Sequence, residues 1–249
     1  MIAIPRYTSY TITTMKSILF ANLTEGNKSD AVEHLITDSS PRAHFFLMVT
    51  LSILMATFGL LIDNIAVVIG SMLIAPILYP VLSLALGLVM LDPKLIGRSL
   101  YTLLRSIFLA IAAAVLVTFI FFGRENGVGE AVLERTVPTV IDFAIAVVAG
   151  FAVSFALVKP SLSETLPGIA ISVSLIPPLA VTGIGIALFD WHIISQSFLL
   201  FLINTAGILL ASAAVFFFMN LSVKKRLAES VIKKEDKKIE KEREKASEE

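Results

Sequence analysis

Two pairs of prolines, Pro76 with Pro80 and Pro177 with Pro178, lie inside long apolar stretches of the chain. Proline has no N–H and clashes with the carbonyl four residues earlier, so it interrupts a helix and leaves backbone groups without partners. Free carbonyl oxygens suit a cation, whereas the N–H groups that begin a new half-helix suit an anion or a carboxylate. The predicted binding residues are these prolines, nearby hydroxyls and one amide: Ser71, Pro76, Pro80, Ser172, Ser174, Pro177, Pro178, Thr182 and Asn204. The alternatives are ordinary kinks satisfied by serine hydroxyls and, for Asn204, a hydrogen bond between helices.

Three acidic side chains lie within or at the ends of apolar segments: Asp63, Asp142 and Glu164. Ionisable groups at such depths are costly and often mark ion or proton pathways. We therefore predict gating, or coupling to protons or cations, for these three residues. For Asp63 and Glu164 the alternative is helix capping at the membrane surface.

The composition is that of an integral membrane protein. Apolar residues make up 56% of the 249 residues and charged residues only 16%, whereas soluble domains average about 25% charged. The even charge balance and the absence of cysteine exclude a nucleic-acid binder with a basic face and a cysteine-ligated metal site. No zinc-protease, nucleotide-binding or nucleophile-elbow motif is present, so we expect no enzyme activity and no cofactor or metal.

Apolar segments of about 20 residues are long enough to cross a bilayer as helices. Six occur, at about 41–62, 64–91, 92–122, 139–158, 167–189 and 195–219. We predict an all-α polytopic protein with an N-terminal segment (1–40), a first transmembrane region (41–122), an external loop (123–135), a second transmembrane region (136–220) and a charged tail (221–249). Ser40 and Pro41 are expected to begin the first helix.

Most of the 20 lysines and arginines would lie on the side of the two termini, which predicts an inner-membrane protein with both termini in the cytoplasm. Lys224, Lys225 and Arg226 directly follow the last span and are expected to contact anionic lipid headgroups. The remaining tail is expected to be a solvated helix. Re-entrant second and fifth segments are an alternative topology, and translation could begin at Met15.

The two halves of the chain resemble each other. Pairing Pro76 with Pro177 also pairs Ser71 with Ser172 and Asp63 with Glu164. An odd number of spans per repeat makes the second copy enter from the opposite face, as in many secondary transporters. The sequence thus predicts two inverted three-helix repeats with proline-broken second and fifth helices; a duplicated scaffold is the alternative.

Small residues recur every four positions on the third, fourth and sixth segments. Ala146, Gly150 and Ser154 form one such stripe, and Gly207 and Ala211 belong to another. Such stripes let helices approach closely, so they predict helix packing within the chain or self-association.

Three blocks resemble a known prokaryotic membrane family, the domain of unknown function numbered 389. They are LIDNIAVVIGSMLIAP at 61–76 with Pro80 after it, LIPPLAVTGIG at 175–185 and INTAGI at 203–208. The resemblance covers about residues 40–220 and implies a multi-pass inner-membrane protein of archaea or bacteria. It supplies neither a substrate nor catalytic residues.

The functional hypothesis is a secondary transporter or channel for a small solute or ion, with a mid-membrane site at the helix breaks. A non-transporting scaffold or regulator is the first alternative, and a membrane-embedded lipid-modifying enzyme is the second. A carrier would have a polar cavity at the breaks, open to one side. A scaffold would show tight packing there and an exposed small-residue face, and an enzyme would show clustered acids beside a lipid-accessible groove.

Overall fold

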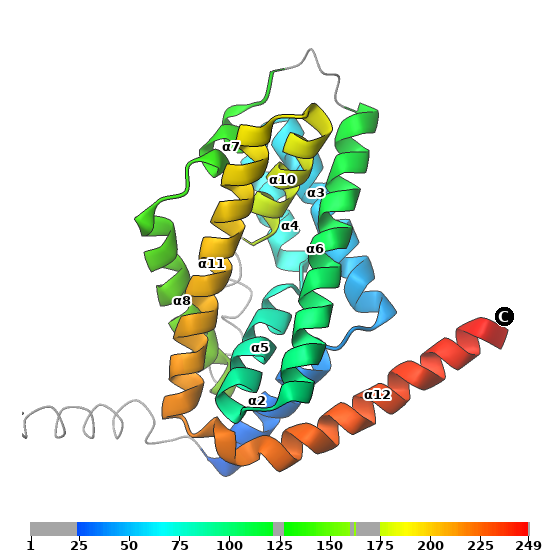
Figure 1. The fold of residues 1–249 in the computed structure, drawn as a ribbon, viewed down its shortest axis with the longest axis vertical. Coiled ribbons are helices and arrows are strands. Elements are labelled where there is room, and N and C mark those ends of the chain that lie inside the picture. Colours follow the sequence, from blue (N-terminus) through cyan, green and yellow to red (C-terminus); the bar gives the residue numbers. More distant parts are fainter. Residues whose placement is uncertain (1–23, 122–126, 160–161, 163–174, 249) are drawn as a thin grey trace, which may run out of the picture.

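The computed structural model describes residues 24–121, 127–159, 162 and 175–248, and every element within them is a helix (Figure 1). In chain order these are α2 (Glu25–Asp38), α3 (Ala43–Leu61), α4 (Ile65–Ile74), α5 (Leu78–Met90), α6 (Pro93–Phe121), α7 (Glu130–Leu133), η1 (Glu134–Thr136), α8 (Val140–Val158), α10 (Ile176–Leu188), α11 (Trp191–Phe218), η3 (Leu221–Lys224) and α12 (Lys225–Glu248).

Four helices in this part of the chain, α3, α6, α8 and α11, are long and apolar enough to cross a membrane. The pair α4 and α5 passes the same test together but is bent by 48°, so it counts as a fifth span if it is one broken helix. The sixth predicted span is not established, because α10 has only 13 residues and residues 163–174 lie outside the described part. The fold is therefore that of an all-helical membrane protein with four to five candidate spans.

Helix starts follow local capping chemistry. The carboxylate of Asp92 accepts hydrogen bonds from the backbone N–H groups of Lys94 and Leu95 and so begins α6 where the sequence predicts. Asp190 caps α11 in the same way, which places its start at Trp191 rather than at residue 195. The predicted cap at Ser40 is wrong, because its hydroxyl donates to the Ile36 carbonyl at the end of α2 and Arg42 precedes α3 instead.

Small residues bring the long helices together, as predicted. A Cβ on Gly150 would lie 2.9 Å from the Cβ of Ala211, and one on Gly207 would lie 2.7 Å from that of Ala146, so α8 and α11 pack backbone to backbone. Gly183 of α10 lies closer still to α6, because its Cβ would be 2.4 Å from that of Ala114.

The two ends of the bundle are covered differently (Figure 1). At one end α12 crosses beneath the bundle and packs on α2, which in turn contacts α5 and α8. The prediction of a fully solvated tail helix is wrong for the first half of α12, where Ala228, Val231 and Ile232 are buried. At the opposite end the short helices α7 and η1 lie against α3 and α11.

Candidate functional site

The chain breaks between α4 and α5 at Pro76. Ala75 adopts an extended conformation, as residues before proline do, and ends α4. Pro76 cannot donate to the carbonyl of Met72, and the other carbonyls in the last turn of α4 also lack helical partners. The Ser71 carbonyl is satisfied from outside, because it accepts a hydrogen bond of 2.6 Å from the hydroxyl of Ser52 on α3. The break therefore places backbone oxygens in the middle of an apolar segment.

The other three prolines lie at helix starts. Pro80 lies in the first turn of α5, and Pro177 and Pro178 lie in the first turn of α10, where an N–H group needs no helical partner. These prolines also remove donors from both helix starts. Within the first three residues of α10 only Ile176 keeps an N–H, and in α5 the Tyr79 N–H is already bonded to the Pro76 carbonyl at 3.1 Å. The site therefore combines carbonyl oxygens of α4 without helical partners with two helix starts from which proline has removed part of the N–H donors.

The half-helices α5 and α10 start at mid-height in the bundle and run toward opposite ends (Figure 1). Each has 13 residues and ends at a left-handed residue, Leu91 with φ 49° or Phe189 with φ 60°, followed by the aspartate that caps the next helix. α10 contacts α4, and its start lies at about the same height in the bundle as the α4–α5 break (Figure 1).

The predicted hydroxyl ligands are engaged within the protein. The Ser71 hydroxyl donates to the Val68 carbonyl at 2.6 Å, and the Thr182 hydroxyl bonds to the Pro178 carbonyl at 2.8 Å and to the Ser197 hydroxyl at 2.9 Å. All three hydroxyl side chains are buried. Asn204 is buried in α11. Ser172 and Ser174, like the predicted gating residue Glu164, lie outside the described residues.

Asp63 and Asp142 both act as caps. The exposed Asp63, with φ 54°, accepts a hydrogen bond of 2.7 Å from the Ala131 N–H and so ties the end of α3 to α7. Asp142 forms a capping box with Thr139 at the start of α8. Gating or coupling by either residue stays a prediction.

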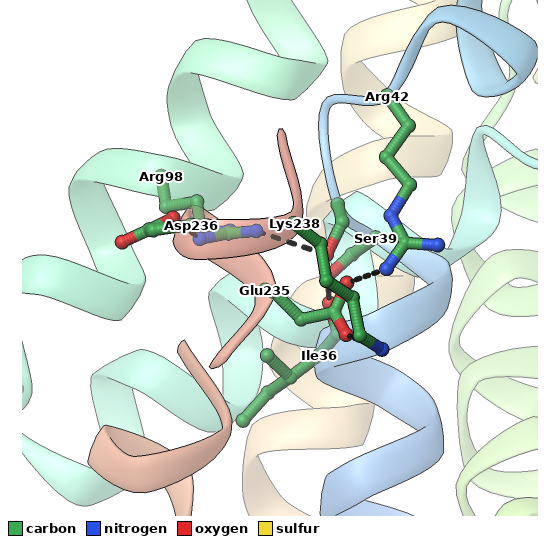
Figure 2. Close-up of polar contacts among 8 residues, drawn as sticks. Ile36, Ser39, Arg42, Arg98, Glu235, Asp236 and Lys238 are labelled. Atoms are coloured by element: carbon green, nitrogen blue, oxygen red, sulfur yellow. Dashed lines mark hydrogen bonds and ion pairs between the residues drawn. The ribbon is translucent and has the colours of Figure 1, made fainter. Parts of the chain in front are cut away.

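A polar cluster that the sequence analysis missed lies at the α2–α12 end of the bundle (Figure 2). Glu235 of α12 pairs with Arg42, the residue preceding α3, and Asp236 pairs with Arg98 of α6. The Arg98 guanidinium also donates to the Ser40 hydroxyl at 3.0 Å. The only local signal is an acidic dipeptide in a lysine-rich helix, because these pairs join residues far apart in sequence.

The pKa of Glu235 reflects both burial and charge. Burial of this carboxyl, which is 1% exposed, acts to raise its pKa, but the hydrogen bond from Lys238 and the charge of Arg42 outweigh burial and hold the pKa below its ordinary value. Burial raises the pKa of Asp38, whose charge faces Glu235 and is opposed by Arg42 and His34. Hydrogen bonds from Lys28 and Lys224 lower the pKa of Glu25 in α2 to about 2.

We predict that acid detaches α12. Docking of α12 lowers the pKa of Glu235, so ionised Glu235 stabilises the docked state at any pH above 4.5, the ordinary pKa of a glutamate. This stabilisation is lost as the pH falls through the lowered pKa of the docked state. Asp38 acts in the opposite direction, since protonation at its raised pKa removes repulsion with Glu235. Distances between spin labels at Glu33→Cys and Glu240→Cys, measured against pH, should therefore stay constant at neutral pH and lengthen only below about 4.5. Lengthening between pH 8 and 6 (roughly the histidine range) would contradict this prediction.

The comparisons with known proteins relate the chain to proteins of unknown function. An uncharacterized protein of Methanocaldococcus jannaschii is 33% identical over 174 residues, which cover 68% of this chain and 52% of that protein, so the chain spans about half the length of this relative. No solved structure matches the chain. The model of the family described as a domain of unknown function, DUF389, matches residues 72–210, more than half of the sequence and including the α4–α5 break, α10 and most of α11; the chain belongs to this family.

Proposed function

We propose that this protein passes a small cation across the inner membrane, with its site at the α4–α5 break and the start of α10. The observation that carries the proposal is the interruption at Pro76, which leaves backbone carbonyls of α4 without helical partners inside an apolar segment. Among small solutes and ions a cation fits best, because prolines remove N–H donors from both half-helix starts. Hard cations prefer oxygen ligands of this kind.

We also propose that the two halves of the chain form an inverted repeat, which would favour a site at this depth. The helix pair α5 and α6 resembles the helix pair α10 and α11. In each pair two hydroxyl groups join the helices at 2.9 Å: Ser83 with Ser99, and Thr182 with Ser197. Aligning the start of α5 with the start of α10 pairs Pro80 with Pro178. The alignment made from the sequence alone pairs Pro76 with Pro177 and is shifted from this one by three residues. In transporters built from inverted repeats, broken helices form the site near the bilayer midplane.

The experiment is ion uptake by the purified full chain in liposomes. Vesicles would be tested separately for uptake of Na⁺, K⁺ and protons, and then for amino acids and organic anions. We expect uptake of at least one cation above protein-free vesicles and no uptake of anions. Uptake of an organic anion alone would contradict the cation assignment, and no uptake by folded, inserted protein would favour the scaffold.

The alternatives have less support. The small-residue stripes of α8 and α11 pack against each other within the chain, so they leave less surface for a scaffold assembled through them. A lipid-modifying enzyme would need clustered acids beside a groove, whereas Asp63 and Asp142 cap different helices.

The distribution of charge between the two ends of the bundle indicates how the protein is oriented in the membrane and which residues meet lipid headgroups. We propose that the α2–α12 end faces the cytoplasm, because Arg42, Arg98 and the basic residues of α12 gather there. Of the three basic residues expected to meet anionic headgroups, Lys224 pairs with Glu25 at 2.9 Å and Lys225 donates to the Leu91 carbonyl at 3.0 Å. Arg226 is exposed and is the most available of the three for a headgroup. Self-association of the chain stays a prediction.

Thr182→Val is expected to leave cation flux within about twofold of the wild type and to cost about 1 kcal/mol of stability or less. The substitution keeps the shape of the side chain and removes a hydroxyl that already bonds to Pro178 and Ser197. Thermal unfolding and liposome flux on the same preparation would measure both effects. A large loss of flux with unchanged stability would instead assign Thr182 to the ion pathway.

A further inference from the structure

Two guanidinium groups and a hydroxyl converge where the α2–α12 end of the bundle meets α3 and α6. Arg42 lies at the start of α3 and Arg98 in the second turn of α6, and their side chains are only 16% and 10% exposed. Ser40 joins them through its hydrogen bond to Arg98. Among the described residues, the buried Nε of each arginine has no hydrogen-bond partner. These three side chains form a site suited to an anion. In this structure the carboxylates of Glu235 and Asp236 occupy it (Figure 2).

We propose that this site, formed by Arg42, Arg98 and Ser40, binds the phosphate of an anionic lipid headgroup, and that α12 masks it until such a headgroup competes. Guanidinium groups bind phosphate oxygens through two parallel hydrogen bonds, as they bind carboxylates, so the carboxylates of α12 and a headgroup phosphate would compete for the same donors. Both arginines lie at helix ends, where a spanning helix meets the headgroup layer. The inference depends on the membrane location of the chain and not on transport.

An anionic membrane surface favours the state in which α12 has left Arg42 and Arg98, for two reasons. It supplies phosphates for the two arginines, and it attracts the detached α12, whose nine basic residues, among them Lys233, Lys234, Lys237 and Lys241, outnumber its seven acidic residues. Each basic residue near such a surface contributes about 1 kcal/mol, and the acidic residues offset most of this attraction. A neutral bilayer supplies neither attraction, so there the carboxylates of α12 keep the site. Because the two states differ in their interaction with the surface, lipid charge shifts the equilibrium between them.

The first test measures the position of α12 directly. The chain has no cysteine, so spin labels at Glu33→Cys on α2 and Glu240→Cys on α12 report on one distance without background labelling. In phosphatidylcholine nanodiscs we expect one short, narrow distance distribution. Addition of phosphatidylglycerol should introduce a longer, broader component. Identical distributions in both lipids would overturn the proposal.

Variants separate release from misfolding. Glu235→Gln with Asp236→Asn should give the long component already in phosphatidylcholine, whereas Glu229→Gln, an exposed residue of the same helix, should not. The charge exchange of Arg42→Glu with Glu235→Arg should restore the short distance lost in Arg42→Glu alone. If the carboxamide variant keeps the short distance, or if the exchange fails to restore it, the ion pairs do not hold α12.

The second test identifies the ligand. Native mass spectrometry should find more retained phosphatidylglycerol on the Glu235→Gln, Asp236→Asn protein than on the wild type. Adding Arg42→Gln and Arg98→Gln should abolish that gain, and an unchanged gain would place the lipid elsewhere. Inorganic phosphate titrated against phosphatidylcholine nanodiscs at constant ionic strength should leave the label distance short. Release by inorganic phosphate would show that the site takes free phosphate and would overturn the headgroup assignment.

Discussion

Replacing Pro76 with alanine is expected to reduce cation flux by about tenfold or more while leaving the protein folded. Alanine restores an N–H that can donate to the Met72 carbonyl and removes a helix-breaking penalty of about 3 kcal/mol. An energy of that size shifts a two-state equilibrium by about 100-fold toward an α4 that continues past residue 76, as far as Pro80 allows. Closing the 48° break in this way would withdraw the carbonyl oxygens that we assign to the ion.

Pro80→Ala is the matched control for this prediction. Pro80 lies in the same segment but in the first turn of α5, where an added N–H would reach only the Pro76 carbonyl, which already accepts from Tyr79, and would leave the break at Pro76 in place. We expect nearly unchanged flux. Flux and thermal stability should be measured on both variants in the same liposomes. Equal losses in the two variants, or full flux in Pro76→Ala, would contradict the assignment of the site to the break.

Gly183→Ala is expected to destabilise the protein by about 1–3 kcal/mol, the usual cost of overpacking a tight core. The new Cβ would lie 2.4 Å from the Cβ of Ala114 and 3.0 Å from the carbonyl oxygen of Ile111, both on α6. Neither atom is the flexible end of a side chain, so α6 and α10 would have to move apart. Thermal unfolding in detergent at fixed protein concentration measures the loss.

Two further variants test this explanation. Ala114→Gly removes the nearer clash, so the double variant Gly183→Ala, Ala114→Gly should recover part of the lost stability. Gly97→Ala on the exposed side of α6 meets no atom within 4 Å and should stabilise the helix by about 0.5–1 kcal/mol. If Gly183→Ala behaves like Gly97→Ala, the close approach of α10 to α6 does not matter for stability.

Sequence reasoning predicted what depends on local chemistry. The α4–α5 break follows from one missing N–H at Pro76, the start of α6 from Asp92 and Pro93, and the bounds of α8 from Thr139 and its apolar run. The packing of α8 on α11 was predictable because glycine and alanine at four-residue spacing leave room for another backbone.

Sequence spacing does not determine which partner a hydroxyl takes. Ser71 and Thr182 were predicted to bind a ligand, which stays a prediction; in the structure their hydroxyls bond to backbone carbonyls of their own helices. The docking of α12 depends on Arg42 and Arg98, more than 130 residues earlier. No local pattern specifies such pairs, so a lysine-rich helix looks solvated until its partners are known.

The contacts of α5 and α10 limit how the protein can move. α10 lies against α6 and α3, whereas α5 lies against α11, so the first half of the described bundle and the second are interlocked. The backbone-level contact at Gly183 leaves no layer of side chains along which α10 could slide on α6. A rocking separation of two rigid halves would have to pull these helices out of each other. Any alternating access must therefore come from smaller displacements, such as hinging of α4 about Ala75, within a frame that stays assembled.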